Sequence, residues 1–197
     1  NSNIIIAKQS SSEIVNEIKK SISKNSSRKH FFNEDYNYSL NENGFIYYED
    51  KNGGIKLPIP KVKGQFQLEN ISTAIATLRS IEELKVSEKH IKDGITKIKS
   101  IARLQEISSG KLKELVKNNK LLVDGSHNPL GAKVLNEYLE SLNCNKHIIL
   151  GMMGNKDHKE YMSYFKNISS LTTIDIPNQP NSIKGKVLKS KLNSFEN

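Results

Sequence analysis

The sequence predicts an α/β fold, and two observations indicate it. Short apolar runs typical of strands alternate with amphipathic segments typical of helices. The clearest case is Leu121–Leu139, where an apolar run ends at Asp124, Gly125 allows a sharp turn, and a helical pattern follows. A strand followed by a helix, repeated along a chain, favours a parallel sheet covered by helices.

The first part of the chain is predicted to form a buried strand, a helix and a hairpin-rich sheet. Ile4–Ala7 is an apolar run typical of a buried strand, and a serine in Ser10–Ser12 can cap the helix that follows. Asn43-Gly44 and Gly53-Gly54 are expected to supply the hairpin turns. The short strands between these turns are expected at Tyr36–Leu40, Phe45–Glu49 and Ile55–Leu57.

Two amphipathic helices are expected next. Asn70 lies early in the first, and Ser87 is the expected cap of the second. Their apolar faces are formed by Ile71, Ala74, Ile75, Leu78 and Ile81, and by Ile91, Ile95 and Ile98. The pattern then changes from hairpins and helices to strand–helix alternation. We therefore predict two domains, residues 1–101 and 102–197.

Polar residues gather at the end of the strand near Leu121–Asp124. Asp124, Ser126 and His127 follow this strand directly, and Asn128 before Pro129 predicts a helix cap. In open α/β sheets, ligands bind at the carboxyl ends of strands. The same residue types also serve as plain turn and cap residues, so both interpretations stand at this point. Two further strands are expected near His147–Leu150 and Leu171–Ile176.

The segment DGSHNP (residues 124–129) resembles the DGAHNP segment of folylpolyglutamate and dihydrofolate synthases, a family within the Mur ligase superfamily. Residues 64–70, GQFQLEN, resemble the family's G-x-H-Q-x-x-N segment, and Arg103-Leu104-Gln105 resembles its G-R-x-Q linker. Residues 151–157 resemble its G-M-x-x-x-K-D turn. The four segments occur in the family's order, and the resemblance extends from Ile4 to about Leu192.

The resemblance implies an ATP-dependent ligase that joins L-glutamate to a folate, to dihydropteroate, or to both, through an acyl phosphate. Residues 1–101 would be the C-terminal part of a Mur-ligase central ATP-binding domain. Residues 102–197 would be an incomplete, Rossmann-like glutamate ligase domain with a mostly parallel sheet. The implied substrates are ATP, L-glutamate and dihydropteroate or folate, the implied ion is Mg²⁺ with its ligands outside this chain, and the implied state is a monomer.

The resemblance also assigns roles to five residues. Asn70 would reach the base of the nucleotide, Arg103 would contact phosphate oxygens, and Asp124 would accept from nucleotide hydroxyls or hold a closed state. Ser126 and His127 are the catalytic candidates, facing the acyl phosphate or the incoming amino acid. The alternatives are a helix-start cap for Asn70, an interface salt bridge for Arg103 and a turn-stabilising role for His127.

Parts of the family pattern are missing or altered. No segment fits the phosphate loop G-x-x-x-x-G-K-[ST], and the family's K-A-G-I segment and its metal-binding residues do not appear. Phe66 and Ala102 stand where the family has histidine and glycine. Lys156 and Asp157 would either line the same cleft or cap a helix. We therefore expect part of a longer chain, which alone does not ligate glutamate.

Composition excludes several other classes. The formal net charge is +9, but the lysines are spread along polar faces and there is no Trp to stack on bases, so no nucleic-acid partner is expected. The apolar runs are too short to cross a bilayer, and Cys144, as the sole cysteine, forms no internal disulfide. The histidines show no metal-ligand spacing. With the resemblance, these features favour a cytoplasmic protein with neither membrane nor metal contacts of its own.

Two other functions stay open at this stage. One is another Mur-type acid–amino-acid ligase, against which the G-x-F-Q-x-x-N segment and DGSHNP favour the folate branch. The other is a non-catalytic nucleotide-binding protein, which the missing phosphate loop would favour.

Overall fold

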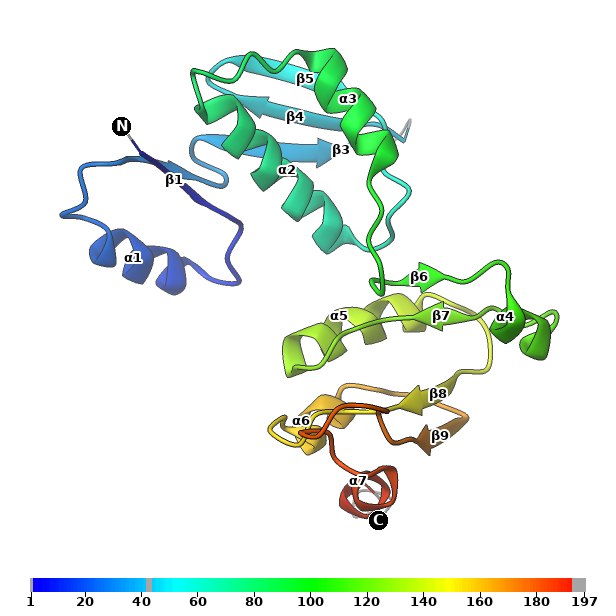
Figure 1. The fold of residues 1–197 in the computed structure, drawn as a ribbon. Coiled ribbons are helices and arrows are strands. Elements are labelled where there is room, and N and C mark those ends of the chain that lie inside the picture. The colour runs from blue at the N-terminus through cyan, green and yellow to red at the C-terminus, as the bar shows by residue number, and fades with distance from the viewer. Residues whose placement is uncertain (1, 42–43, 193–197) are drawn as a thin grey trace. The chain divides into compact units, whose positions relative to one another are not determined.

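The computed structural model describes residues 2–41 and 44–192, and it confirms the α/β class (Figure 1). The chain divides into two compact units, residues 1–100 and 101–197. Each unit has its own hydrophobic core.

The first unit begins with a parallel strand pair joined by a helix. Strands β1 (Asn3–Ile6) and β2 (Arg28–Phe31) pair in parallel, and helix α1 (Ser12–Ser21) connects them. Ser11 caps α1, because its side chain accepts from the Ile14 N–H. The sequence RKHF of β2 is polar except for the buried Phe31, which is why its pattern did not predict a strand.

Three antiparallel strands follow, in the order β3 (Tyr36–Leu40), β4 (Ile46–Asp50) and β5 (Gly53–Leu57). The prediction of a turn at Gly53-Gly54 is wrong, since both glycines lie in the ladder, opposite Asp50 and Glu49. The turn falls at Lys51-Asn52, where Asp50 accepts from the Asn52 N–H at 2.8 Å. Of the other expected turn, Asn43 lies outside the described residues, and Gly44 has a positive φ of 72°.

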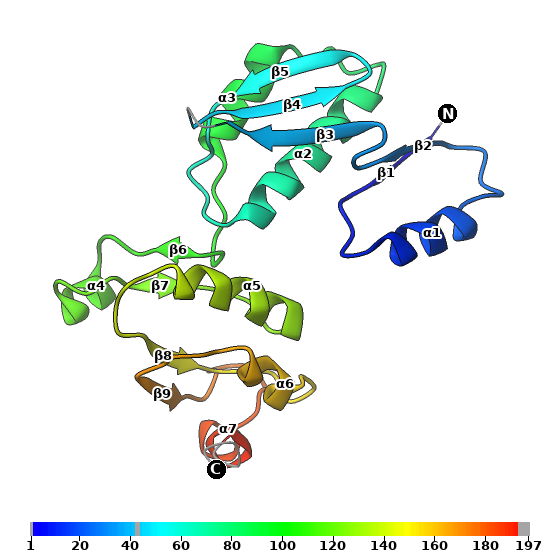
Figure 2. The ribbon, with the colours of Figure 1, turned by 180° about the vertical axis from the view of Figure 1, so that it is seen from behind.

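Helices α2 (Gln65–Ser80) and α3 (Glu88–Lys97) cover one face of this sheet, in front of it in Figure 1 and behind it in Figure 2. Ser87 caps α3 as predicted, in a reciprocal box with His90. The buried core lies between helices and strands: Tyr36, Ile46, Tyr48, Ile55, Leu57, Ile71, Ile75, Ala76, Ile91 and Ile95. The Tyr36 hydroxyl ties this core to β1 by donating to the Ile6 carbonyl at 2.9 Å.

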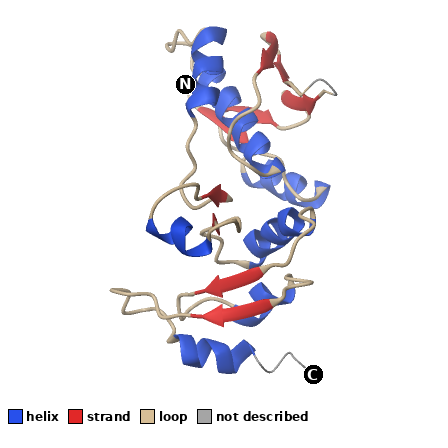
Figure 3. Cartoon of the chain, turned by 90° about the vertical axis from the view of Figure 1, so that its right-hand side faces the viewer, coloured by secondary structure: helices blue, strands red, loops and turns tan. Residues whose placement is uncertain are grey.

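The second unit alternates strands and helices, as the sequence predicted. Its elements are β6 (Gln105–Glu106), α4 (Lys111–Val116), β7 (Leu122–Val123), α5 (Pro129–Glu140), β8 (His147–Leu150), α6 (His158–Ser163), β9 (Ser170–Thr173) and α7 (Gly185–Leu192). Strands β8 and β9 run parallel and appear as adjacent arrows in Figure 3. Strand β7 instead pairs antiparallel with β6, a short contact of two residues that no sequence pattern indicated.

Helices α5, α6 and α7 enclose the core of the second unit. Ala132 of α5 and Leu188 of α7 are fully buried, and the ring of Tyr161 in α6 packs at 5.3 Å from that of Phe165. The small side chain of Ala132 lets α5 pack closely on this core, and the larger side chain of Tyr161 on α6 fills the core beside it. This core holds α6 in place, and α6 carries Tyr161, which belongs to the site described next.

Candidate functional site

The segment DGSHNP forms the predicted strand–turn–helix. Strand β7 ends at Val123, and Asn128 caps α5 by accepting from the Gly131 N–H at 2.8 Å. Pro129 occupies the first turn, where its missing N–H leaves no helical hydrogen bond unmade. Asp124, Ser126 and His127 therefore stand together directly after a strand.

Asp124 ties this turn to the segment that opens the second unit. One carboxylate oxygen accepts from the Leu104 N–H and the other from the Ser126 N–H, both at 2.8 Å. The Gly125 N–H donates to the Ala102 carbonyl at 2.7 Å. Two hydrogen bonds thus join residues 102–104 and 124–126, while the bond from the Ser126 N–H lies within the turn itself. Charge-assisted bonds to backbone N–H groups, such as those of Asp124, are the stronger kind.

The segment around Arg103 is sharply turned. Ala102 and Leu104 adopt left-handed backbone conformations, with φ of 52° and 47°, and the Gln105 side chain accepts from the Ala102 N–H at 2.9 Å. The Leu104 side chain is buried, whereas Arg103, which lies between Ala102 and Leu104, is exposed. A Cβ at Gly125 would lie 3.3 Å from Arg103 Nη1, so glycine there leaves room for the guanidinium. The turn presents a permanent positive charge beside Asp124.

Ser126 faces into the unit and His127 faces out. The Ser126 Oγ lies 3.0 Å from the hydroxyl of Tyr161, whose ring is buried. Burial raises the pKa of Tyr161, the Ser126 contact opposes this, and the charge of Asp124 adds to it, so the phenol stays protonated at neutral pH.

His127 is exposed, and its Nδ1 lies 3.0 Å from the Gly125 carbonyl oxygen. Because a carbonyl only accepts, Nδ1 must carry the hydrogen in this contact. In the neutral ring, Nε2 is then left with a free lone pair facing away from that carbonyl. The imidazole can therefore take up a proton at Nε2.

The other candidates occupy different positions. Asn70 is exposed within α2, and the residue that caps this helix is Gly64, so the interpretation of Asn70 as a helix-start cap is wrong. Asp157 caps α6 by accepting from the Glu160 N–H at 2.9 Å, which confirms the capping interpretation. Asn70 belongs to the first unit, whereas Arg103, Asp124, Ser126 and His127 come together in the second.

Sequence reasoning missed two participants. Gln105 was noted as part of the linker motif, but its bond to the Ala102 N–H closes the turn. Tyr161 belongs to none of the four motif segments, and its partner Ser126 lies 35 residues away. A contact at that separation leaves no signal in a local pattern.

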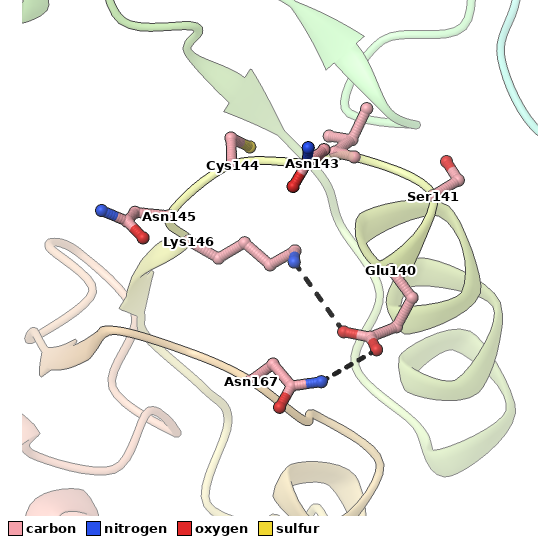
Figure 4. A pocket seen from close by; sticks show the side chains of 8 residues that line it. Glu140, Ser141, Asn143, Cys144, Asn145, Lys146 and Asn167 are labelled. Carbon is pink, nitrogen blue, oxygen red and sulfur yellow. Dashed lines mark hydrogen bonds and ion pairs between the residues drawn. The ribbon is translucent and has the colours of Figure 1, made fainter.

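A separate, open hollow of about 630 Å³ lies where α5 leads into β8 (Figure 4). Glu140 accepts there from Asn167 at 3.1 Å and lies 3.9 Å from the Lys146 ammonium. This hollow is at the amino end of β8, whereas α/β folds bind ligands at carboxyl ends. We therefore assign the candidate site to residues 102–105 and 124–128.

No group of three or more His, Cys, Asp or Glu side chains among the described residues could hold a metal ion. No helix in residues 2–41 and 44–192 is long and apolar enough to cross a membrane.

Solved structures resemble this fold over nearly its whole length, although no protein-family model and no curated protein matches the sequence. FolC of E. coli in complex with DHPP and ADP matches with a TM-score of 0.77 and 22% identity over 98% of this chain. The folylpolyglutamate synthase of Mycobacterium tuberculosis complexed with ADP matches at 0.78 and 15% identity, also over 98%. The chain has the fold of these synthases.

A third match is the bifunctional folylpolyglutamate synthase/dihydrofolate synthase of Yersinia pestis, complexed with AMPPNP and a Mn ion. It has a TM-score of 0.75 and 19% identity over 98% of this chain. In all three matches the chain covers 43% of the solved chain, less than half of its length. The predicted fold is thus confirmed for a part of such a structure.

Proposed function

We propose that this chain is part of an ATP-dependent ligase of the folylpolyglutamate synthase/dihydrofolate synthase family. The ligase would add L-glutamate to a folate, to dihydropteroate, or to both. The observation that carries the proposal is the DGSHNP turn, where Asp124 binds the backbone beside Arg103 at the end of a strand. The fold around this turn is shared with the synthases over 98% of the chain.

The proposed reaction has two steps. The substrate carboxylate attacks the γ-phosphate of ATP, which releases ADP and forms an acyl phosphate. The amine of glutamate then attacks the acyl carbon, the tetrahedral intermediate expels phosphate, and the nitrogen loses a proton. Such a reaction needs charge neutralisation and positioning rather than a protein nucleophile.

Arg103, Asp124 and Asn70 are proposed to bind the nucleotide. Arg103 is exposed on a tight turn, and its planar fork suits phosphate oxygens. Asp124 keeps that turn in place through Leu104, which makes its contribution to nucleotide binding indirect. The exposed amide of Asn70 can both donate and accept, as adenine recognition requires.

Ser126 and His127 are proposed to serve the second step. The unprotonated Nε2 of His127 can accept the proton that the attacking amine loses. The Ser126 hydroxyl can donate to a phosphate oxygen or to the oxyanion.

ATP and Mg²⁺ would complete the site, with Mg²⁺ neutralising phosphate charge. As the resemblance implies, we propose that the ligands of this ion lie outside this chain. Residues 1–101 are proposed as the end of the central ATP-binding domain and residues 102–197 as part of the glutamate ligase domain. We further propose that the protein is a cytoplasmic monomer that acts on small molecules.

The test is glutamate incorporation by the complete protein that contains this chain. With ATP, Mg²⁺ and either dihydropteroate or a reduced folate, we expect a product that requires both L-glutamate and ATP. Arg103→Ala should lower the rate constant roughly 10- to 100-fold, which is the loss of one charge-assisted contact. Arg28→Ala, an exposed arginine paired with Glu82, is the matched control and should leave the rate unchanged.

Two other results of this assay would indicate a different function. A product formed only with another amino acid would indicate a different Mur-type ligase. Nucleotide binding without any ligated product would indicate a non-catalytic nucleotide-binding protein. The 197-residue chain alone is expected to form no product.

A further inference from the structure

Tyr161 and Ser126 form a hydroxyl pair that the proposed mechanism does not require. Their oxygens lie 3.0 Å apart and connect α6 with the DGSHNP turn. The family segment that this turn resembles has alanine at the position of Ser126. The pair is therefore a property of this chain and calls for its own explanation.

The pair is the inner end of a series of hydrogen bonds. The hydroxyl of Tyr161 is paired with the Ser126 Oγ. The N–H groups of Ser126 and Leu104 both donate to the carboxylate of Asp124, which extends the series to Leu104. Both ends are anchored, since the side chains of Tyr161 and Leu104 are each only 3% exposed. The series links the core of the second unit to the turn that presents Arg103.

The hydrogens can be assigned from burial. A buried tyrosine hydroxyl needs an acceptor for its hydrogen, and the Ser126 Oγ is within reach. Burial keeps Tyr161 protonated, because it raises the pKa of the phenol. When Tyr161 donates, the half-buried Ser126 keeps its own hydrogen for another acceptor.

We propose that Tyr161 is a positioning residue for the nucleotide and acyl-phosphate site. By accepting the tyrosine hydrogen, Ser126 is fixed with its own hydroxyl hydrogen directed away from the core, toward an anionic ligand oxygen. The same bond holds the turn that places Asp124, and through Leu104 the position of Arg103. The identity of the anion rests on the proposed function, whereas the positioning of the turn does not.

The first test is residue-resolved amide hydrogen exchange of the 197-residue chain by NMR. Tyr161→Phe removes one oxygen and keeps the ring that packs on Phe165. We expect the Leu104 and Ser126 amides to exchange roughly 2- to 10-fold faster, the range for losing one hydrogen bond. Tyr164→Phe, the same change at the end of the same helix, is the control and should leave both amides unchanged.

A double-variant cycle separates positioning from general weakening. Ser126→Ala should accelerate the same two amides, and the double variant should exchange no faster than the faster single variant. Amides of α7 serve as an internal reference for overall stability. Wild-type exchange at Leu104 and Ser126 in Tyr161→Phe, or effects that add in the double variant, would overturn the proposal.

The second test concerns the ligand and uses the complete protein. Tyr161→Phe should raise the KM for ATP or lower kcat, and Ser126→Ala, which removes the donor itself, should lower activity at least as much. Adding Tyr161→Phe to Ser126→Ala should then lower activity no further. A complete protein that shows no ligation would refute the proposed function, while the exchange measurement would still decide whether Tyr161 positions the turn. Full activity in Tyr161→Phe together with accelerated exchange would refute the role toward the ligand.

Discussion

Asp124 accepts a hydrogen bond at 2.8 Å from the backbone N–H of Leu104, a residue 20 positions earlier in the chain. The sequence suggested a carboxylate free to meet a nucleotide, but both of its oxygens hold backbone N–H groups. A side chain with such partners shapes the site from within. Its removal is therefore expected to have a structural consequence.

We expect Asp124→Ala to destabilise the second unit by about 1–3 kcal/mol, because the N–H of the buried Leu104 loses its acceptor. Asp124→Asn keeps one carbonyl oxygen and should cost less. Urea unfolding followed by circular dichroism measures both. Asp93→Ala, at an exposed position on α3, is the control, and an equal loss there would contradict a specific role for Asp124.

A substitution at Ala102 is expected to stabilise the chain instead of destabilising it. The φ of 52° at Ala102 is left-handed, which costs an L-residue about 1–2 kcal/mol, while the extra chain freedom of glycine costs about 0.5–1 kcal/mol. Ala102→Gly should therefore stabilise the chain by about 0.5–1 kcal/mol. Ala132→Gly, within α5, should instead destabilise it by about 1 kcal/mol, and the same sign for both would refute the argument.

Two arginine ion pairs among the described residues of the first unit should differ sharply in their contribution to stability. Arg79 pairs with Asp50 at 3.0 Å, and the two side chains are only 14% and 9% exposed. Arg79→Ala should cost about 3–5 kcal/mol, because it leaves a buried carboxylate unpaired. Arg28→Ala breaks an exposed pair and should cost less than about 1 kcal/mol in the same thermal or urea unfolding experiment. Similar losses would show that burial does not set the difference.

Asp175 should contribute a small pH dependence to the second unit. The Gly185 N–H and then Lys184 lower the pKa of its carboxyl below the ordinary value. The contribution is thus present above the ordinary pKa of about 3.9 and is lost as the pH falls through the lowered pKa of the folded state. A side-chain carboxyl titration by NMR should show the lowered midpoint, and Lys184→Ala should bring it partly back. A midpoint at the ordinary value would exclude these contacts in solution.

Local signals account for most of what the sequence predicted. Ser87 and Asn128 cap helices because a short side chain accepting from a nearby N–H is a property of a few consecutive residues. The strand β2 was missed because its sequence, RKHF, buries only one side chain. At Gly53-Gly54 the glycines suggested a turn, yet the Tyr47 side chain lies against Gly54 and would have to move if residue 54 carried a Cβ.

The candidate site was predictable only in part. A strand–turn–helix places Asp124, Ser126 and His127 together whatever the remaining chain does. The partners of these residues depend on tertiary packing: Leu104 and Tyr161 come from segments 20 and 35 residues away. The left-handed backbone at Ala102 was signalled only by the glycine that the family has at this position, since alanine itself gives no sign of it.

The two hydrogen bonds between residues 102–104 and 124–126 also have a mechanical consequence. They hold the backbone of residues 102–104 against residues 124–126 of the second unit. Backbone rotation between the two units is therefore expected in the residues that precede Ala102. The backbone of Arg103 therefore belongs to the second unit, although its exposed side chain keeps its own rotations. In any rotation of that unit, the backbone that carries the guanidinium would move together with Asp124.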